Sequence, residues 1–537
     1  MYSVSLNESY FPAQEGEAPS PMTVGALLRA SAEKWPDAMA MREVGLDGTM
    51  GRSWTYAQLW EEAERLGRVL AGRHAKGARV AVWAPNVPEW IFLEFGLALA
   101  GVTLVTVNPS YQQRELEYVL NQSGAEALYL VENFRGNPMK EIAEAAIAAA
   151  PRVKAIINIS DAQALFAGEP GDLPSVSPGD PAQIQYTSGT TGFPKGAVLH
   201  HHGLTRNGLD CMARLDFRPG DKSLNYMPLF HTTGCAVHTL GVMGKGGEML
   251  LMPMFEPVAA AEVLEREKVS MIVGVPTMII ALIEEAKRSK RDFSSVRSVT
   301  SGGSMVSPEL ARATEQFFGS VVQIIYGQTE TSPVITMAWR NDALDDLVGT
   351  IGQPLPHVAV SIRDPQTNAV TPCGEQGEIC TRGYLTMIGY NANDEATAKT
   401  IDSDGWLHTG DLGTMDARGY VKITGRVKEM IIRGGENLFP AEIENAILEH
   451  EAIAEAAVVG VPDEKWGEQV ACFMRAAGGE KPAPGALKTF IRERISPQKT
   501  PAFWIWVDEW PLTGSGKIQK FKLAEAFKNG AFDPLTA

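Results

Sequence analysis

The sequence predicts an α/β fold in two domains, and three observations lead to that prediction. The chain has 537 residues, more than one hydrophobic core usually organises. Its first four hundred residues alternate helix-like and strand-like segments, as parallel sheets covered by helices require. After about Gly425 the pattern changes to a small α+β unit of roughly 110 residues, a size that can fold alone. We therefore expect a large N-terminal domain of layered sheets and helices over 1–425 and a small C-terminal domain over 426–537.

Two pairs of segments illustrate the alternation in the N-terminal part. Residues 55–73, TYAQLWEEAERLGRVLAGR, have the apolar spacing of an amphipathic helix and precede the strand-like RVAVWAP at 79–85. The Ala-rich MKEIAEAAIAAAP at 139–151 precedes VKAIINI at 153–159 in the same way. This order predicts parallel strands connected by helices.

The most membrane-like stretch runs from Trp90 to Val107, but Glu94 interrupts it and Gly96 and Gly101 divide it. A span needs about twenty uninterrupted apolar residues, so we expect a buried helix that ends near Gly101 and then a strand. The N-terminus has neither a basic region nor an apolar core of the kind that signal peptides carry. The sequence therefore predicts no transmembrane segment and a cytoplasmic location.

The charge balance limits the class of partner. The chain has 48 Lys and Arg against 64 Asp and Glu, a formal net charge of −16. Most of such a surface repels a polyanion, so we expect no nucleic-acid partner, although a local basic pocket for a small anionic cofactor is compatible with this charge. The sequence does not determine an oligomeric state, and a homodimer is left open.

The cysteines and the histidine run argue against a disulfide framework and a zinc site. Five cysteines are an odd number and form no CxxC pair, which fits a reducing compartment. The run His200, His201 and His202 has no cysteine or carboxylate at ligand spacing, and we interpret it as polar turn residues. The cysteines are Cys211, Cys235, Cys373, Cys380 and Cys472.

The stretch YTSGTTGFPKG, from Tyr186 to Gly196, is rich in glycine and hydroxyl groups and follows the strand-like IQYT. Glycine lets the backbone approach phosphate oxygens closely, and the amide groups can form an anion nest. The Walker pattern does not fit, because Pro194 stands five residues after Gly189 and Gly196 follows Lys195. We expect strand, glycine-rich turn and then a helix after Val198, with a polar surface turn as the alternative.

A second segment repeats this theme, and five further motifs accompany it. VRSVTSGGSMVSPELARATEQFFG predicts a strand that leads to Gly302 and Gly303, with Pro308 near the start of a helix. The further motifs are PLFHTTG (228–234), YGQTET (326–331), GWLHTGDLG (405–413), GRVKEMIIRGGENLFPAEIE (425–444) and PLTGSGKIQK (511–520).

Together with the glycine-rich stretch, these motifs resemble the adenylate-forming superfamily, and in particular its acyl-CoA synthetases. The resemblance runs from about residue 25 to residue 525, and the order and spacing of the motifs carry it rather than any one of them. It implies a large AMP-binding domain and a small mobile C-terminal domain. It also implies an ATP- and Mg²⁺-dependent acid:CoA ligase that forms an acyl-AMP, releases pyrophosphate and transfers the acyl group to coenzyme A.

The resemblance assigns the nucleotide and metal contacts. Glu330 would hold magnesium, which one or two carboxylates suffice to bind, and Thr329 would contact the α-phosphate. Tyr326 would lie against adenine, with a core aromatic at a strand end as the alternative, and Asp411 with Arg426 would bind the ribose hydroxyls. The remaining nucleotide-binding candidates are Thr187, Ser188, Gly189, Thr190, Thr191, Gly192 and Lys195 for the β- and γ-phosphates, and Gly302, Gly303, Ser304, Gly327 and Gln328.

The resemblance also assigns the C-terminal and acyl groups. Lys517 would bridge the attacking carboxylate and the α-phosphate, because a point charge offsets the repulsion of two anions. The small domain would then rotate about Lys428, so that Gly434 and Gly435 replace the lysine loop and let pantetheine pass. The substrate-pocket candidates are His231, Gly234 and Val334, with a packed loop histidine as the alternative for His231.

Small and apolar residues after His231 favour an apolar acyl chain or ring over a charged or sugar-like substrate. The segment GRVKEMIIRGGENLFPAEIE resembles the fatty-acyl types most, which implies a medium- or long-chain fatty acid. An aryl or cinnamate-type acid is the next alternative, followed by a ligase that loads a carrier protein. A luciferase-like oxygenase would share the motifs, whereas a nonenzymatic nucleotide-binding protein would be expected to lack Lys517 or Glu330.

Overall fold

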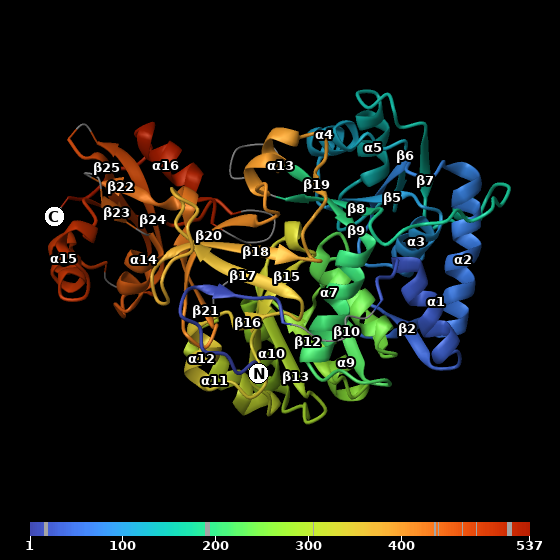
Figure 1. Cartoon of the computed structure of the whole chain (residues 1–537), viewed down its shortest axis with the longest axis horizontal. Helices are drawn as coiled ribbons and strands as arrows, with labels where there is room; N and C mark the ends of the chain where they lie inside the picture. Colours follow the sequence, from blue (N-terminus) through green and yellow to red (C-terminus); the bar gives the residue numbers. More distant parts are fainter. Residues whose placement is uncertain are drawn as a thin grey trace.

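The computed structural model describes residues 1–14, 20–187, 194–303, 306–433, 436–438, 440–463, 465–478, 481–512 and 518–536. Figure 1 shows a large body that carries the N-terminal and central parts of the chain, with the C-terminal part at one end of its long axis. In the described ranges the strands form four sheets, three in the body and one in the C-terminal part. The α/β architecture with a large and a small part confirms the predicted fold class, whereas the boundary at 425/426 stays a prediction.

The first sheet has the order β19-β9-β8-β5-β4-β6-β7. Its strands are β4 (Arg79–Trp83), β5 (Thr103–Val107), β6 (Ala127–Leu130), β7 (Ala155–Asn158), β8 (Pro181–Thr187), β9 (Lys195–His200) and β19 (Gly389–Tyr390). The helices of this part are α1 (Val24–Lys34), α2 (Tyr56–Arg73), α3 (Pro88–Leu99), α4 (Gln113–Ser123), α5 (Met139–Ile147) and α6 (Ala162–Leu165). The expected helices at 55–73 and 139–151 and the buried helix before Gly101 are all present, and the strands β4 to β7 pair in parallel. Within the described chain, no helix combines the length and the apolar character that crossing a membrane requires.

The second sheet has the order β16-β15-β14-β13-β12-β10-β11-β2-β3. Its strands are β2 (Met39–Val44), β3 (Met50–Thr55), β10 (Lys222–Asn225), β11 (Glu248–Leu251), β12 (Met271–Gly274), β13 (Ser298–Gly302), β14 (Val322–Gly327), β15 (Val334–Met337) and β16 (Gln353–Pro354). Around it lie α7 (His201–Arg214), α8 (Gly241–Gly244), α9 (Pro257–Arg266), α10 (Pro276–Ser289), α11 (Pro308–Phe318), α12 (Leu344–Gly349), the 3-10 turn η2 (Thr329–Thr331) and the π-helix η1 (Thr233–Leu240). The expected strand before Gly302 and the helix that begins at Pro308 are confirmed.

The third sheet, β1-β17-β18-β20-β21, connects the body to the C-terminal part. It contains β1 (Tyr10–Phe11), β17 (Val358–Arg363), β18 (Gly377–Gly383), β20 (Leu407–Met415) and β21 (Val421–Arg426), with α13 (Asp394–Thr400) before β20 and the 3-10 turn η3 (Val427–Glu429) after β21. The C-terminal part has β22 (Ile431–Arg433), β23 (Glu436–Leu438), β24 (Ile453–Asp463), β25 (Gly467–Ala476), β26 (Phe503–Trp506), α14 (Pro440–Leu448), α15 (Pro484–Arg492), α16 (Lys520–Lys528) and the 3-10 turn η4 (Pro497–Lys499). In Figure 1, β17, β18, β20 and β21 lie between the two parts.

One local expectation was wrong, and it concerns the segment before α7. The helix expected after Val198 is present as α7, which begins at His201 and follows β9, the strand that pairs antiparallel with β8. The histidine run is not a turn: His200 ends β9 and its Nδ1 accepts the Gly203 N–H at 3.0 Å, which caps α7. His201 is buried and its Nδ1 accepts the Val24 N–H at 3.3 Å, and burial lowers its pKa to about 4.

Candidate active site

The carboxyl ends of four neighbouring strands form one edge of the second sheet. Strands β10, β12, β13 and β14 are parallel, so the residues that follow them meet at that edge. Ligands bind at such edges in α/β folds because the loops there converge. The candidates Gly302, Gly303, Tyr326, Gly327 and Gln328 all lie at the ends of β13 and β14.

The glycines at this edge are required by close packing of the backbone. A β-carbon on Gly302 would lie 2.6 Å from the Ile325 carbonyl oxygen, and one on Gly327 would lie 1.9 Å from the Pro333 carbonyl oxygen. Gly303 adopts φ +82°, a left-handed conformation that side chains disfavour. These glycines therefore shape the edge itself, and contact with a nucleotide stays a prediction for them.

Tyr326, Asp411 and Arg426 are brought together from three strands. Asp411 on β20 lies opposite Arg426 on β21, and the Arg426 Nε is 2.9 Å from Asp411 Oδ1. The Tyr326 hydroxyl donates to Asp411 Oδ2 at 2.8 Å. Burial and the Asp411 charge raise the pKa of Tyr326, so the hydroxyl keeps the proton that it donates. Because Tyr326 is also part of the main core, the structure leaves both interpretations of this residue open.

Glu330 is buried in η2 and is held from two sides. Its backbone carbonyl accepts the Met387 N–H at 2.9 Å, and its Oε1 accepts the hydroxyl of Tyr390 at 2.7 Å. Thr329, beside it, is also buried. Glu330 is therefore a buried, oriented carboxylate and not a solvated loop residue. Burial and the Glu330 charge raise the pKa of Tyr390, which keeps the hydroxyl a donor.

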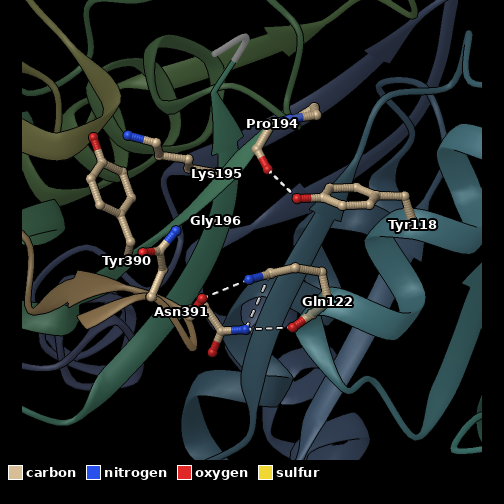
Figure 2. A pocket seen from close by; sticks show the side chains of 8 residues that line it. Tyr118, Gln122, Pro194, Lys195, Gly196, Tyr390 and Asn391 are labelled. Atoms are coloured by element: carbon tan, nitrogen blue, oxygen red, sulfur yellow. Dashed lines mark hydrogen bonds between the residues drawn. The ribbon is translucent and has the colours of Figure 1, made fainter. Parts of the chain in front are cut away.

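Lys195 approaches the same tyrosine at the start of β9. Its Nζ lies 4.8 Å from the centre of the Tyr390 ring, within the range of a cation–π contact. Figure 2 shows Lys195 and Tyr390 at a cavity of about 210 Å³. Thr187 pairs with Lys195 across the β8–β9 hairpin, so the two ends of the glycine-rich stretch are held in register. The cavity is lined by Tyr118, Gln122, Pro194, Lys195, Gly196, Tyr390, Asn391 and Asn393.

Two contacts brace the wall of this cavity. The Tyr118 hydroxyl donates to the Pro194 carbonyl oxygen at 2.7 Å. Gln122 Nε2 donates to the Asn391 carbonyl oxygen at 2.6 Å, and Asn391 Nδ2 donates to the Gln122 carbonyl oxygen at 2.7 Å (Figure 2). Helix α4 is thereby attached both to the end of the glycine-rich stretch and to β19.

The substrate-pocket candidates lie in different surroundings. His231 is exposed next to Phe230, just before the π-helix η1. A β-carbon on Gly234 would lie 2.2 Å from the Pro228 carbonyl oxygen, so this glycine packs against backbone. Val334 is buried on β15, where its N–H donates to Asn207 Oδ1 at 3.1 Å. A π-helix of eight residues is rare and often marks a functional site, which fits the region where an acyl group is expected.

Lys428 lies in η3, a turn with no buried residue, between two anchored neighbours. On its N-terminal side Arg426 pairs with Asp411 of the body. On its C-terminal side Glu429 pairs with Lys520 of α16 at 2.9 Å, and Lys520 also pairs with Glu444 at 2.8 Å. Burial alone would lower the pKa of Lys520, but the two carboxylates outweigh it and raise that pKa.

Several candidates lie outside the described residues. They are Ser188, Gly189, Thr190, Thr191 and Gly192 of the glycine-rich stretch, Ser304, Gly434 and Gly435, and the predicted catalytic lysine Lys517. Their assignments stay predictions.

Sequence reasoning missed Tyr390 and Tyr118. Neither belongs to one of the quoted motifs, and both make hydroxyl contacts with residues far away in the chain. The pairing of β19 with β9 brings Tyr390 to Lys195, and no local spacing encodes it.

Comparisons with known proteins agree with this geometry. The sequence profile of AMP-binding enzymes matches residues 28–391, and that of the AMP-binding enzyme C-terminal domain matches residues 442–517. The mitochondrial medium-chain acyl-CoA ligase ACSF2 of Mus musculus is 36% identical over 94% of this chain and 87% of its own length. The crystal structure of ATP-bound MatB from Rhodopseudomonas palustris superposes with a TM-score of 0.84 at 29% identity, over 95% of this chain and 99% of that one. The Mycobacterium tuberculosis fatty acyl CoA synthetase superposes with a TM-score of 0.77 at 28% identity, over 95% and 99%. The chain therefore belongs to the adenylate-forming AMP-binding enzymes, and within them to the acyl-CoA synthetase type.

Proposed function

We propose that this chain, as an ATP-dependent acid:CoA ligase, acts on a medium- or long-chain fatty acid through an acyl-adenylate. The observation that supports the nucleotide part most directly is the convergence of Lys195 and Glu330 on Tyr390. A cation for phosphate oxygens and a carboxylate for a divalent metal are both needed where a metal-bound triphosphate is held.

The reaction has two displacements. A carboxylate oxygen of the acid attacks the α-phosphorus of ATP, the bond to the bridging oxygen breaks, and pyrophosphate leaves. The thiolate sulfur of coenzyme A then attacks the acyl carbon, and AMP leaves with the electron pair of the anhydride oxygen. The first step creates negative charge on pyrophosphate, so fixed donors and a cation beside it lower the barrier.

The residues divide between these demands. Thr187, Lys195 and the stretch between them bind the β- and γ-phosphates, and Thr329 contacts the α-phosphate. Asp411 accepts hydrogen bonds from the ribose hydroxyls, which a carboxylate does more strongly than an amide. Arg426 and Tyr326 hold that carboxylate from opposite sides, which fixes its orientation before the nucleotide arrives.

The donor set at Glu330 fits magnesium. Mg²⁺ prefers carboxylate and phosphate oxygens with water, and Glu330 is a buried carboxylate whose Oε1 already accepts the Tyr390 hydroxyl. Glu330 would hold the ion, whose charge would offset that of the triphosphate in the first displacement. The part of the protein is to hold the Glu330 carboxylate in one orientation through Tyr390 and through the Met387 N–H.

The C-terminal part supplies the second cation. Lys517 bridges the acid and the α-phosphate in the first step and withdraws before the thiol enters. We place the pivot at Lys428, because the ion pairs of Arg426 and Glu429 attach the chain firmly on both sides and leave Val427 and Lys428 between them. Residues Gly434 and Gly435 then line the path of pantetheine.

The acid is apolar in this proposal. The segment after His231 forms the buried η1, which includes Gly234, and α8, and Val334 is a buried apolar residue on β15. The printed names of two relatives, a medium-chain acyl-CoA ligase and a fatty acyl CoA synthetase, support a fatty acid. An aryl or cinnamate-type acid is the second candidate, since the same apolar surface would accept a ring.

A reducing compartment such as the cytoplasm fits the thiols. All five cysteines are free, and Cys211, Cys235, Cys380 and Cys472 are buried. The chain therefore has no disulfide to lose in a reducing environment.

The test is acid-dependent ATP–pyrophosphate exchange over a panel of fatty, aryl and short polar acids, followed by thioester detection with coenzyme A. We expect exchange with medium- or long-chain fatty acids and a CoA thioester as product. Exchange with aryl acids alone would replace the fatty-acid proposal, and exchange without transfer to coenzyme A would point to a carrier protein. No exchange with any acid would refute the ligase activity.

A further inference from the structure

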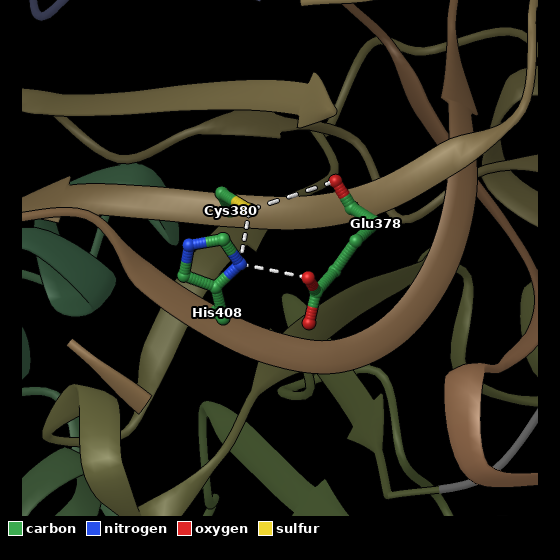
Figure 3. A group of neighbouring side chains, drawn as sticks. All are labelled: Glu378, Cys380 and His408. Carbon is green, nitrogen blue, oxygen red and sulfur yellow. Dashed lines mark hydrogen bonds and ion pairs between the residues drawn. The ribbon is translucent and has the colours of Figure 1, made fainter. Parts of the chain in front are cut away.

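A group of side chains on the paired strands β18 and β20 contacts the segment that carries the Asp411 carboxylate. Figure 3 shows Glu378, Cys380 and His408, and the three residues belong to neighbouring strands. No part of the proposed chemistry uses them.

These strands pair through an irregular segment. Cys380 lies opposite His408 and Glu378 lies opposite Leu412, so Ile379 alone faces Thr409, Gly410 and Asp411. A bulge of this kind re-aims side chains and often lies beside active sites. Here it carries Asp411 toward Tyr326 and Arg426.

Side chains hold the bulge in its shape. Thr409 Oγ1 donates to the Ile379 carbonyl oxygen at 2.7 Å and accepts the Asp411 N–H at 3.1 Å. Gly410 adopts φ +74°, and its N–H donates to Glu378 Oε1 at 2.9 Å. The Glu378 carboxylate is thus the partner of the backbone amide directly before Asp411.

His408 and Asp402 hold Glu378 in turn. His408 Nδ1 lies 2.7 Å from Glu378 Oε2, and since a carboxylate only accepts, the ring nitrogen carries the proton. The other ring nitrogen lies 3.5 Å from Asp402 Oδ2, and Asp402 Oδ1 accepts the N–H groups of Asp404 and Trp406 at 2.9 Å. A chain of charged hydrogen bonds therefore runs from a turn to the bulge.

We propose that Glu378 and His408 are positioning residues for nucleotide binding, because they fix the bulge that presents the Asp411 carboxylate. This inference rests on the proposed function, in which Asp411 binds the ribose hydroxyls. The two residues act on the orientation of Asp411 and are not themselves contacts of the nucleotide. Small misplacement of a binding group costs roughly ten- to hundredfold in activity, so the supporting residues have a measurable effect.

A metal ion is the competing explanation of this group. The ligand atoms of Glu378, Cys380 and His408 lie within 4.8 Å of one another, and zinc accepts such donors. Internal contacts account for them, however: the Cys380 sulfur lies 3.4 Å from His408 Nδ1, and Cys380 packs with Ala359 and Trp406. Burial raises the pKa of the Cys380 thiol, whereas a metal ligand would have to be a thiolate.

The test measures ATP–pyrophosphate exchange by the full chain with ATP and with 2′-deoxy-ATP. The ATP preference is the ratio of exchange activity with ATP to that with 2′-deoxy-ATP. Asp411→Ala shows how much of this preference remains when the proposed ribose contact is removed. We expect Glu378→Ala to raise KM for ATP roughly ten- to hundredfold and to lower the ATP preference toward that of Asp411→Ala, with KM for the acid unchanged within about twofold. Glu378→Gln keeps an oxygen that can accept the Gly410 N–H, so its KM for ATP should rise less than that of Glu378→Ala. His408→Asn keeps an N–H donor, so its KM for ATP should rise less than that of His408→Ala.

The matched control is Glu265→Ala. Glu265 also accepts a backbone N–H, that of Asp292 at 2.8 Å, and also pairs with a cation, Arg291, at 3.1 Å. It lies at the end of α9, outside the candidate site, and its removal should change neither KM nor the ATP preference.

Each remaining outcome decides between explanations. If Asp411→Ala lowers the ATP preference while a folded Glu378→Ala does not, the positioning proposal is wrong. If Asp411→Ala leaves the preference unchanged, the ribose assignment itself fails, and the positioning proposal fails with it. Should Glu378→Ala not fold, the same KM comparison with Glu378→Gln decides. Zinc that copurifies in stoichiometric amount with the wild-type chain and is lost in Cys380→Ser would assign the group to a metal and overturn the proposal.

Discussion

The parts of the molecule on either side of η3 are built differently. Among the described residues, the body has a large hydrophobic cluster that extends from Phe11 to Val421 and a small one of Ala359, Cys380 and Trp406. The C-terminal part has two small clusters, which begin at Ile431 and Ala457. In the body, the candidate carboxylates Asp411 and Glu330 are held by buried hydroxyl groups. The candidate carboxylates of the body are therefore held in place by its own side chains, whereas the C-terminal part has hydrophobic clusters of its own.

The largest expected effect tests whether the C-terminal part supplies chemistry. Lys517→Ala should lower acid-dependent ATP–pyrophosphate exchange roughly hundred- to thousandfold, because two anions would meet without the bridging cation. Thioester formation from supplied acyl-adenylate should be spared. Lys522→Ala, which removes an exposed lysine on α16, is the control and should change neither step. If Lys517→Ala slowed adenylation and thioester formation equally, the proposal that Lys517 acts only in adenylation would be contradicted.

Lowering the pH should destabilise the body more than the C-terminal part. Burial lowers the pKa of His238 to about 3 and that of His201 to about 4, and both lie in the body. Between pH 6.5, the pKa of a histidine in the unfolded chain, and these lower pKa values, the unfolded chain binds more protons than the folded one. The free energy of unfolding of the body therefore falls as the pH falls. Each histidine contributes about 2 kcal/mol of this loss at pH 5, since one pKa unit corresponds to about 1.4 kcal/mol.

Thermal unfolding at pH 8 and pH 5 checks this sign. The transition of the body should move to lower temperature at pH 5, while that of the C-terminal part, whose one histidine is His450, should move less. His201→Asn should flatten the pH dependence and His450→Asn should not. Equal shifts of both transitions would show that groups other than these histidines determine the pH dependence.

His408 has the opposite pH dependence, because the Glu378 carboxylate raises its pKa and the resulting stabilisation is lost as pH rises.

A smaller effect tests whether the body orients Glu330, the proposed metal ligand, before the metal binds. Tyr390→Phe removes the hydroxyl that donates to Glu330 but keeps the ring beside Lys195. Hydrogen bonds to charged groups contribute about 1.5–3 kcal/mol, so the Mg²⁺ concentration for half-maximal exchange should rise roughly ten- to hundredfold. Tyr384→Phe is the control, because its hydroxyl also donates to a carboxylate, Asp210 at 2.8 Å. An unchanged Mg²⁺ requirement would mean that Glu330 needs no support from Tyr390.

The smallest expected effect concerns the connection itself. Lys428→Pro fixes one backbone dihedral in η3 and should slow thioester formation about tenfold while adenylation changes little. Lys428→Ala keeps the backbone free and serves as the comparison in single-turnover measurements of each step. A normal second step in Lys428→Pro would place the pivot elsewhere.

The sequence allowed prediction of the fold because helical and strand-like spacings are local. It also allowed Tyr326, Asp411 and Arg426 to be proposed together, since each lies in its own motif. The side chains that hold the candidate residues in place were not predictable from the sequence. Tyr390 contacts Glu330 because β19 pairs with β9, and Glu378 contacts Gly410 because of a bulge between β18 and β20. Such contacts depend on register between distant strands. The helix after Val198 was predicted correctly, but the strand Lys195–His200 before it was not, because its pairing with β8 is a tertiary contact that local composition does not encode.

The short distance along the chain between Arg426 and Glu429 has a thermodynamic consequence. Arg426 pairs with the Asp411 carboxylate and Glu429 pairs with Lys520 of α16. Under the proposed function, occupancy of the ribose site and orientation of the C-terminal part would therefore be linked. Linkage is reciprocal: whichever orientation holds the nucleotide more tightly is the one that the nucleotide populates. Release of AMP and return of the C-terminal part to the orientation for the next turnover would then be coupled to each other.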